Sequence, residues 1–142
     1  MYPPRMSDPS KAYFAFPGPL RDSLVAAILA GEKTSTTSLL IEYEHDDEPL
    51  PEAGERSIVV DSEDKPVAVI ETTDVRVLRL RDIDLAHAID EGEGYKTVAA
   101  WRAGHEHFWH SPEMLSYLGD LSFVVDDDTL AVAERFRLVE RL

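Results

Sequence analysis

The sequence predicts one α+β domain in which a mixed β-sheet or small barrel carries helices at its periphery. Its 142 residues are the usual size of a single domain, and 44% of them are apolar, as in globular proteins. Segments rich in β-branched residues outnumber helical ones, and the two kinds do not alternate regularly along the chain. A doubly wound parallel sheet, which needs such alternation, is therefore disfavoured.

The first helix is expected between Leu20 and Ala30. Apolar residues recur there at the spacing of one helical face: Leu20, Leu24, Ala27 and Ile28. Pro19 can occupy the first turn, where its missing N–H costs nothing, and Gly31 is a typical C-terminal stop. The chain then passes through a run of hydroxyl residues into the apolar segment 39–41, which is expected to be a strand.

Strands are expected to dominate the middle of the chain. Residues 42–55 are acidic and contain two prolines and a glycine, which indicates an exposed loop. Segments 57–61 and 67–80 are rich in Val, Ile and Thr, which favours strands.

The last third is expected to combine three helices with a closing hairpin. The helices are expected at 82–90, 95–108 and 112–118, the first of them ending before two closely spaced glycines. Residues 121–125 and 130–139 are expected to form the two strands of the hairpin, around a turn at 126–128.

The chain is strongly acidic, with 28 acidic against 14 basic residues and a formal charge of −14. Long nucleic acids are held largely by cations that face phosphates, so this charge opposes their binding. A surface adapted to solubility or salt explains the same charge without any ligand. If the ligand is related to nucleic acid, we expect it to be a small nucleoside or a short RNA rather than a long duplex.

Composition also bears on location and domain organisation. The chain has no cysteine, which removes disulfides and thiolate metal sites. The first residues lack the apolar region of a signal peptide, and no apolar run approaches the ~18 residues that span a membrane. We expect a cytoplasmic protein without a membrane partner, in which residues 1–18 are an N-terminal extension and 19–142 form one domain.

The most informative segment for function runs from Gly31 to Ser38 and places Lys33 among hydroxyl residues. If the Lys33 amine is desolvated, its neutral form is favoured and could take a proton from the hydroxyl of Thr36. The structural alternative is that the lysine favours the helix dipole while the hydroxyls cap a turn. Phosphate-binding loops, nucleotide fingerprints and the Gly-x-Ser-x-Gly elbow are absent from the sequence.

A second candidate is the segment Glu91-Gly92-Glu93-Gly94-Tyr95. Two carboxylates separated by glycine cannot lie in a rigid helix interior, and the glycines let the backbone approach a ligand closely. A glutamate in such a loop is a candidate general acid. An ordinary acidic turn is the alternative.

A third candidate is the helix expected at 95–108, where Arg102 and His105 share one stripe with apolar residues. Charged groups on such a stripe need partners, which a structural Arg–Glu pair or a binding site would provide. Glu71 is a charge within a β-branched strand and is a further possible member of the site. The histidines at 105, 107 and 110 lack the i, i+4 spacing of helical metal ligands, so no metal and no cofactor are expected.

Taken together, these segments resemble the ASCH domain family of the PUA-like superfamily. The resemblance is carried by Ala30 to Thr37, by the Glu-Gly-Glu-Gly string at 91–94 and by Trp101-Arg102-x-x-His105. It runs from about Gly31 to the closing strands, and residues 42–61 fit the larger bacterial subgroup. It implies a PUA-like mixed sheet or barrel with helices around a cleft, and a link to RNA or modified nucleosides.

The resemblance also implies roles for residues. Small members of the family that hydrolyse N4-acetylcytidine use a lysine, a threonine three residues later and a downstream glutamate. Lys33 and Thr36 match the first two, and Glu93 matches the third, with Glu91 as its rival. Thr37, Ser38, Glu71, Glu91, Tyr95, Arg102 and His105 are then the expected ligand-binding residues. Those enzymes carry an arginine where this chain has Ser38, a contact that Arg102 could supply.

Two classes of function follow. In the first, the protein is an amidohydrolase for an N4-acylcytidine-type nucleoside, with Thr36 as nucleophile, Lys33 as base and Glu93 as acid. In the second, it is an RNA-binding module or a ribonuclease, in which Lys33, Arg102 and Tyr95 grip and stack RNA. The acidic charge favours the first. The sequence does not indicate an oligomeric state.

Overall fold

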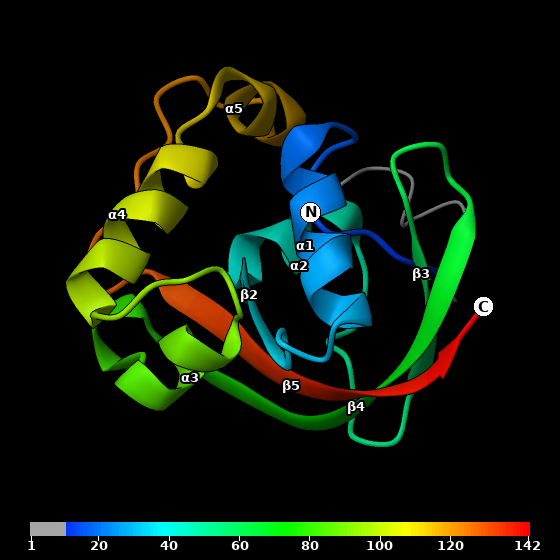
Figure 1. Cartoon of the computed structure of the whole chain (residues 1–142). Coiled ribbons are helices and arrows are strands. Elements are labelled where there is room, and N and C mark those ends of the chain that lie inside the picture. The colour runs from blue at the N-terminus through cyan, green and yellow to red at the C-terminus, as the bar shows by residue number, and fades with distance from the viewer. Residues whose placement is uncertain (1–10) are drawn as a thin grey trace.

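The computed structural model describes residues 11–142 as five strands in one sheet, with helices around it (Figure 1). Residues 1–10 of the predicted N-terminal extension lie outside this range. The elements are β1 Lys11–Ala12, α1 Pro19–Leu29, β2 Ser35–Leu39, α2 Leu40–Asp46, β3 Arg56–Val60, β4 Pro66–Arg79, the 3₁₀ turn η2 Leu80–Asp82, α3 Leu85–Asp90, α4 Val98–Trp109, α5 Pro112–Leu118 and β5 Leu130–Arg141.

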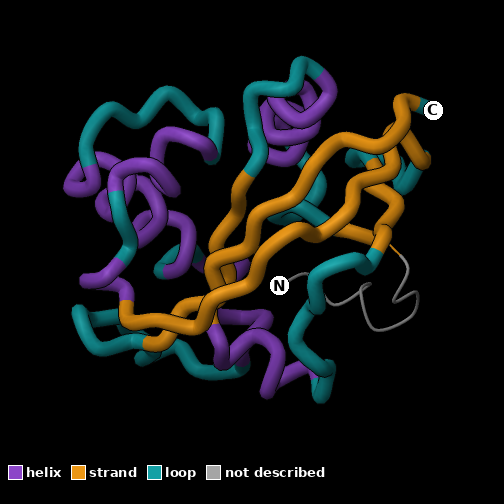
Figure 2. The backbone as a smooth tube through the Cα atoms, turned by 90° about the horizontal axis from the view of Figure 1, so that it is seen from below, coloured by secondary structure: helices purple, strands orange, loops and turns teal. Residues whose placement is uncertain are grey.

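The sheet is mixed and open, with the strand order β1-β3-β4-β5-β2. The β1–β3 pair is parallel and the other pairs are antiparallel. Strands β4 and β5 pair along most of their length, with register shifts between Val69 and Ile70 and between Thr72 and Asp74 that help the ladder to bend. Figure 2 shows these strands crossing the molecule from a group of helices toward the C-terminus. The predicted α+β class with a mixed sheet is confirmed, and the sheet is not closed into a barrel.

Two apolar clusters hold the helices on the sheet. One joins α1 to β3, β4 and β5, and the curve of the long strands beneath α1 is visible in Figure 1. The other is centred on Trp101 and Trp109 of α4 and includes Leu39, Ala131 and Ala133 from the neighbouring strands β2 and β5. The segment between α1 and β2 therefore runs where the two clusters meet. None of the helices within residues 11–142 has the length and hydropathy needed to cross a membrane.

The first helix, the strands at 57–61 and 67–80 and the helix at 112–118 are confirmed to within one or two residues. The strand predicted at 39–41 is wrong beyond Leu39, because α2 begins at Leu40. The backbone N–H of Leu39 donates to Oε2 of Glu42 at 2.7 Å, which closes the first turn of that helix. The acidic segment 42–55 is therefore only partly a loop, and its Glu42 and Tyr43 are buried.

The predicted hairpin of 121–125 with 130–139 is also wrong. Both edges of β5 are already paired, one with β4 and the other with β2, so β5 has no free edge for a further strand. Residues 121–125 form turns and loop instead, with the side chains of Leu121 and Val124 80% and 71% exposed.

Candidate active site

Lys33 is positioned by the way in which α1 ends. Gly31 adopts a positive φ of 77° after the helix, and the backbone N–H groups of Glu32 and Lys33 both donate to the carbonyl of Ala27. This turn directs Lys33 inward, where the residue is only 2% exposed. Its amine Nζ donates to the carbonyl oxygens of Ser35 at 2.8 Å and Glu91 at 3.3 Å.

The loop that follows α3 brings two carboxylates to the same amine. Lys33 Nζ lies 3.8 Å from Oε1 of Glu91 and 3.9 Å from Oε2 of Glu93. Gly92 makes the approach possible, since it has a φ of 71° and a Cβ there would lie 2.6 Å from the carbonyl oxygen of Glu32. The glycine between the two glutamates thus allows this loop to pack closely against the turn that carries Lys33.

Glu91 is the buried centre of the cluster and is 1% exposed. Its Oε2 accepts from Thr37 Oγ1 at 2.7 Å and from Trp101 Nε1 at 2.9 Å, while Oε1 pairs with His105 Nε2 at 2.9 Å. Burial alone would raise the pKa of Glu91, but the charge of Lys33 and the hydrogen bonds from the neighbouring histidines outweigh burial and hold this pKa well below its ordinary value. Glu91 is therefore a fixed anion with its acceptor positions filled.

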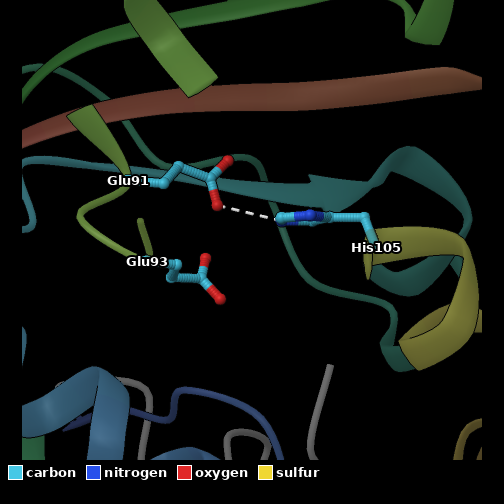
Figure 3. Close-up of side chains that lie close together, drawn as sticks. All are labelled: Glu91, Glu93 and His105. Carbon is cyan, nitrogen blue, oxygen red and sulfur yellow. Dashed lines mark hydrogen bonds and ion pairs between the residues drawn. The ribbon is translucent and has the colours of Figure 1, made fainter. Parts of the chain in front are cut away.

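His105 points directly at this carboxylate, as Figure 3 shows. Its Nδ1 lies 2.9 Å from the carbonyl oxygen of Trp101, which can only accept, so Nδ1 carries a proton. Its Nε2 faces the ionised Glu91, so we assign the ring as an imidazolium with both protons engaged. Burial lowers the pKa of His105, but the hydrogen bond and charge of Glu91, together with the charge of Glu93, raise it above its ordinary value. The ring also stacks on Trp101, with centroids 4.2 Å apart.

Glu93 differs from Glu91 because it keeps an opening to the cavity, with 18% of its side chain exposed. Burial raises the pKa of Glu93 above its ordinary value; the charge of Lys33 opposes this rise and the charge of Glu91 adds to it. Two neighbouring carboxylates thus have their pKa values pushed in opposite directions. This is the arrangement in which one carboxyl can hold a proton for transfer while the other stays ionised. Burial, followed by the charges of Glu93 and Glu91, also raises the pKa of Tyr95, so its phenol stays protonated at neutral pH.

These groups line one cavity of about 560 Å³. Nearly all the predicted site residues contribute to its wall: Lys33, Thr36, Thr37, Ser38, Glu91, Glu93, Tyr95 and His105. Thr36 and Thr37 are neighbours on β2, which is an edge strand, and Thr37 is the one that bonds Glu91. The cavity therefore combines a hydroxyl, an amine and a carboxyl group with a raised pKa, which are the elements of acyl transfer.

Two predicted residues lie outside this wall. Glu71 projects from β4 between two arginines, at 3.1 Å from Arg56 Nε and 3.3 Å from Arg137 Nε, and is part of a cross-strand ion-pair ladder. Arg102 lies on α4 with its guanidinium directed at Asp127, 3.1 Å away, and at Glu106. Arg102 and His105 lie on the same stripe of α4, but their side chains reach different partners. Arg102 reaches Asp127 and Glu106, whereas His105 reaches Glu91. Arg102 is therefore not among the residues that line the cavity.

Sequence reasoning missed two residues that bond to the cluster. Trp101 enters the sequence analysis only as part of a motif, and His87 carries no prediction there. His87 contacts both Thr37, at 2.7 Å from Oγ1, and Glu91, at 3.4 Å from Oε2. The i, i+4 spacing of His87 and Glu91 was the available signal, because residues so spaced share a helix face.

The cluster also has the composition of a metal site. Glu91, Glu93 and His105 each offer one ligand atom, and these atoms lie within 4.8 Å of one another. A divalent cation could use such a set. The Lys33 amine stands beside both carboxylates, however, and Nε2 of His105 is engaged with Glu91. A bound metal would have to replace both interactions.

Removal of the Glu91 charge is expected to destabilise the fold. In Glu91→Gln, Lys33 and His105 lose a buried counter-charge, and breaking such a pair typically costs about 3–5 kcal/mol. Urea unfolding at neutral pH measures the loss. Because the pKa of Glu91 is lowered in the fold, its contribution is full above the ordinary value of 4.5 and is lost as the pH falls through the folded value. The difference between native protein and variant should therefore shrink in acid.

Glu71→Gln is the matched control, because it removes a glutamate from an exposed ion-pair ladder. Exposed pairs contribute little to stability, so a small change is expected. Equal destabilisation by the two substitutions would contradict the central place given to Glu91.

A family model and solved structures of other proteins are similar to this chain. The family model described as ASCH domain matches residues 11–140. The structure of protein EF3133 from Enterococcus faecalis, which carries the family description DUF984, is similar with a TM-score of 0.76 and 27% identity, over 91% of this chain and 75% of that one. The ASCH domain from Lactobacillus crispatus has a TM-score of 0.73 and 28% identity, over 90% of this chain and 77% of that one. No curated protein matches the chain.

Proposed function

Because the chain belongs to the ASCH domain family, whose PUA-like fold is associated with RNA-related function, we propose that it hydrolyses an amide on a modified nucleoside of the N4-acylcytidine type. One observation carries the proposal: Lys33, Thr36 and Glu93 line a single cavity. The volume of that cavity, about 560 Å³, lies in the range of sites for small organic ligands.

The first half of the reaction forms an ester on Thr36. In the substrate complex the Lys33 ammonium first gives a proton to the Glu93 carboxylate, which lies 3.9 Å away in the free protein. Oγ1 of Thr36 then attacks the carbonyl carbon of the amide, and the hydroxyl proton passes to the amine of Lys33 freed in this way. The tetrahedral oxyanion collapses, the C–N bond breaks, and the leaving amine takes a proton from the carboxyl group of Glu93. The acyl group then rests on Thr36, which divides one difficult step into two easier ones.

The second half restores the protein. Water attacks the ester carbon and gives a proton to the Glu93 carboxylate. The Thr36 oxygen leaves with the proton held by the Lys33 ammonium, and a carboxylic acid is released. The amine and the hydroxyl are expected to come within hydrogen-bond distance when substrate is bound, as catalytic groups often do only in the complex.

The surroundings of Lys33 and Glu93 support these roles. The carbonyl oxygens of Ser35 and Glu91 accept two of the N–H groups of the Lys33 amine, and the carboxylates of Glu91 and Glu93 lie nearby to receive the third proton. Transfer of that proton to Glu93 would leave the lone pair that the base needs. Glu93 is favoured over Glu91 as the acid, since its pKa is raised and its side chain is open to the cavity. Glu91 is better suited to orient Lys33 and His105.

The charge distribution favours a nucleoside over a long RNA. Six arginines of the described strands and their flanks lie within ion-pair distance of acids: Arg56, Arg76, Arg79, Arg81, Arg135 and Arg137. Arg141, at the end of β5, donates to the carbonyl oxygen of Leu29. Paired arginines in a chain of charge −14 leave little positive field for a phosphate backbone. RNA binding or cleavage in the same cavity is the competing reading.

One experiment separates the two readings. Purified protein is incubated with N4-acetylcytidine, and separately with labelled single-stranded RNA, at two salt concentrations. We expect release of cytidine and acetate at rates that change little with salt, because a neutral nucleoside releases few counterions. RNA mobility should not change. A salt-sensitive shift or cleavage of RNA, with no release of acetate, would support the competing reading and overturn the proposal.

A further inference from the structure

The cavity has a second half that the proposed reaction does not use. Away from the charged cluster its wall is largely apolar and is built from the segment before α1, the start of α1, and helices α4 and α5; the α4–α5 part also contributes His107, Ser111 and Glu113. The apolar residues are Phe16, Pro17, Leu20, Phe108 and Met114, and we call their space the apolar chamber.

The chamber is held in shape by contacts that do not involve a ligand. The ring of Phe16 packs on that of Phe108, with centroids 5.9 Å apart, and so ties the segment before α1 to α4. The buried guanidinium of Arg21 donates to the carbonyl oxygens of Phe14 at 3.1 Å and Ala15 at 2.7 Å. These hydrogen bonds fix the backbone immediately before Phe16. The chamber is therefore formed before a ligand enters.

Leu20 gives a further indication of what the chamber holds. It lies in the first turn of α1 and is 43% exposed, although the apolar stripe of that helix otherwise packs on the sheet. Its exposed surface lines the cavity. An apolar ligand group placed there would remove this surface from water, which contributes roughly 25 cal/mol for each Å² buried.

We propose that the apolar chamber binds the acyl group of the substrate, so that the preferred substrates carry an acyl chain or aromatic acyl group larger than acetyl. The inference rests on the proposed function. The amide must lie at Lys33, Thr36 and Glu93, which leaves the chamber for one of its two substituents. The ribose and base carry hydroxyls and ring heteroatoms that lose hydrogen bonds against an apolar wall. An alkyl or phenyl group loses none.

The test uses a series of N4-acylcytidines with acetyl, butanoyl, hexanoyl and benzoyl groups. We expect kcat/KM to rise about threefold to fourfold for each CH₂ that enters the chamber, from the ~0.8 kcal/mol gained by burying one CH₂. Leu20→Ala should reduce the ratio of hexanoyl to acetyl kcat/KM several-fold. Because Leu20 is 43% exposed, its truncation removes little of the core. Phe108→Ala is a second variant on another wall of the chamber and should lower the same ratio.

Ile89→Ala is the matched control, because Ile89 is 50% exposed on α3 and is not among the residues that line the cavity. It should leave the ratio unchanged. If acetyl is cleaved but longer groups give no gain, the chamber proposal is wrong while the hydrolysis stands. If no member of the series is cleaved, the hydrolysis is wrong, and calorimetric binding decides the chamber: affinity that grows with chain length and falls in Leu20→Ala supports it, and affinity independent of length overturns it.

Discussion

A Lys33→Arg variant is expected to keep the fold and to lose about 10²- to 10⁴-fold in turnover of N4-acetylcytidine, the usual contribution of a general base. Arginine preserves the positive charge beside Glu91 and Glu93, but its guanidinium does not release a proton near neutrality. It therefore cannot accept the proton of Thr36. A lysine that acts only through its charge, or by favouring the end of α1, would tolerate the change with modest loss.

Steady-state kinetics and urea unfolding must be measured on the same preparation of this variant. Lys33 is 2% exposed, and a poorly folded variant would also be inactive. Lys96→Arg, at an exposed position between Glu93 and α4, is the matched control and should leave both quantities unchanged. Near-native turnover by a folded Lys33→Arg protein would show that Lys33 is not the base.

A Thr36→Val variant is expected to show the larger loss, on the order of 10⁴- to 10⁶-fold, which is the range for removing the nucleophile of a hydroxyl hydrolase. Valine keeps the β-branched shape that suits β2 and removes only the hydroxyl. Turnover is measured with the same nucleoside substrate. Combined with Lys33→Arg, the substitution should add little, because residues that act as one unit are not additive.

Thr34→Val tests whether the effect belongs to Thr36 alone. Thr34 directly precedes β2, and its hydroxyl contacts the carbonyl oxygen of Asp90 at 3.5 Å without lining the cavity. The Thr34→Val variant should retain activity. Similar kinetics for the two threonine variants would remove Thr36 from the role of nucleophile.

The local parts of the fold were predictable from the sequence. The stripe of α1 with its stop at Gly31, and the β-branched runs of β3 and β4, are encoded by neighbours in the chain. The errors arose where tertiary contacts decide. Leu40 and Ile41 have the composition of a strand, but the Glu42 carboxylate bonds the N–H of Leu39 and starts a helix. Residues 121–125 and 130–139 flank a turn and so predict a hairpin, but β4 and β2 occupy the two edges of β5.

The candidate site was likewise predictable only in the parts that neighbouring residues in the sequence determine. The hydroxyl run predicts Lys33 and the glycine-separated pair predicts Glu91 or Glu93, of which the resemblance favours Glu93; the structure brings Lys33 and Glu93 within 3.9 Å. The different surroundings of Glu91 and Glu93 were not predictable, because they depend on how α4 docks Trp101 and His105 against the loop. Nor could the sequence show that Arg102 turns away from the cavity toward Asp127, since one helical stripe can serve two neighbours.

Rapid-quench mass spectrometry can detect the acyl group that the proposed reaction places on Thr36. Native protein is mixed with excess N4-acetylcytidine, quenched in acid within the first turnovers, and digested for peptide mapping. An acetyl group is expected on the peptide that contains Thr36, formed together with a burst of cytidine and absent from Thr36→Val. Release of cytidine at full rate by Thr36→Val, with no acetylated peptide in either protein, would contradict this role of Thr36.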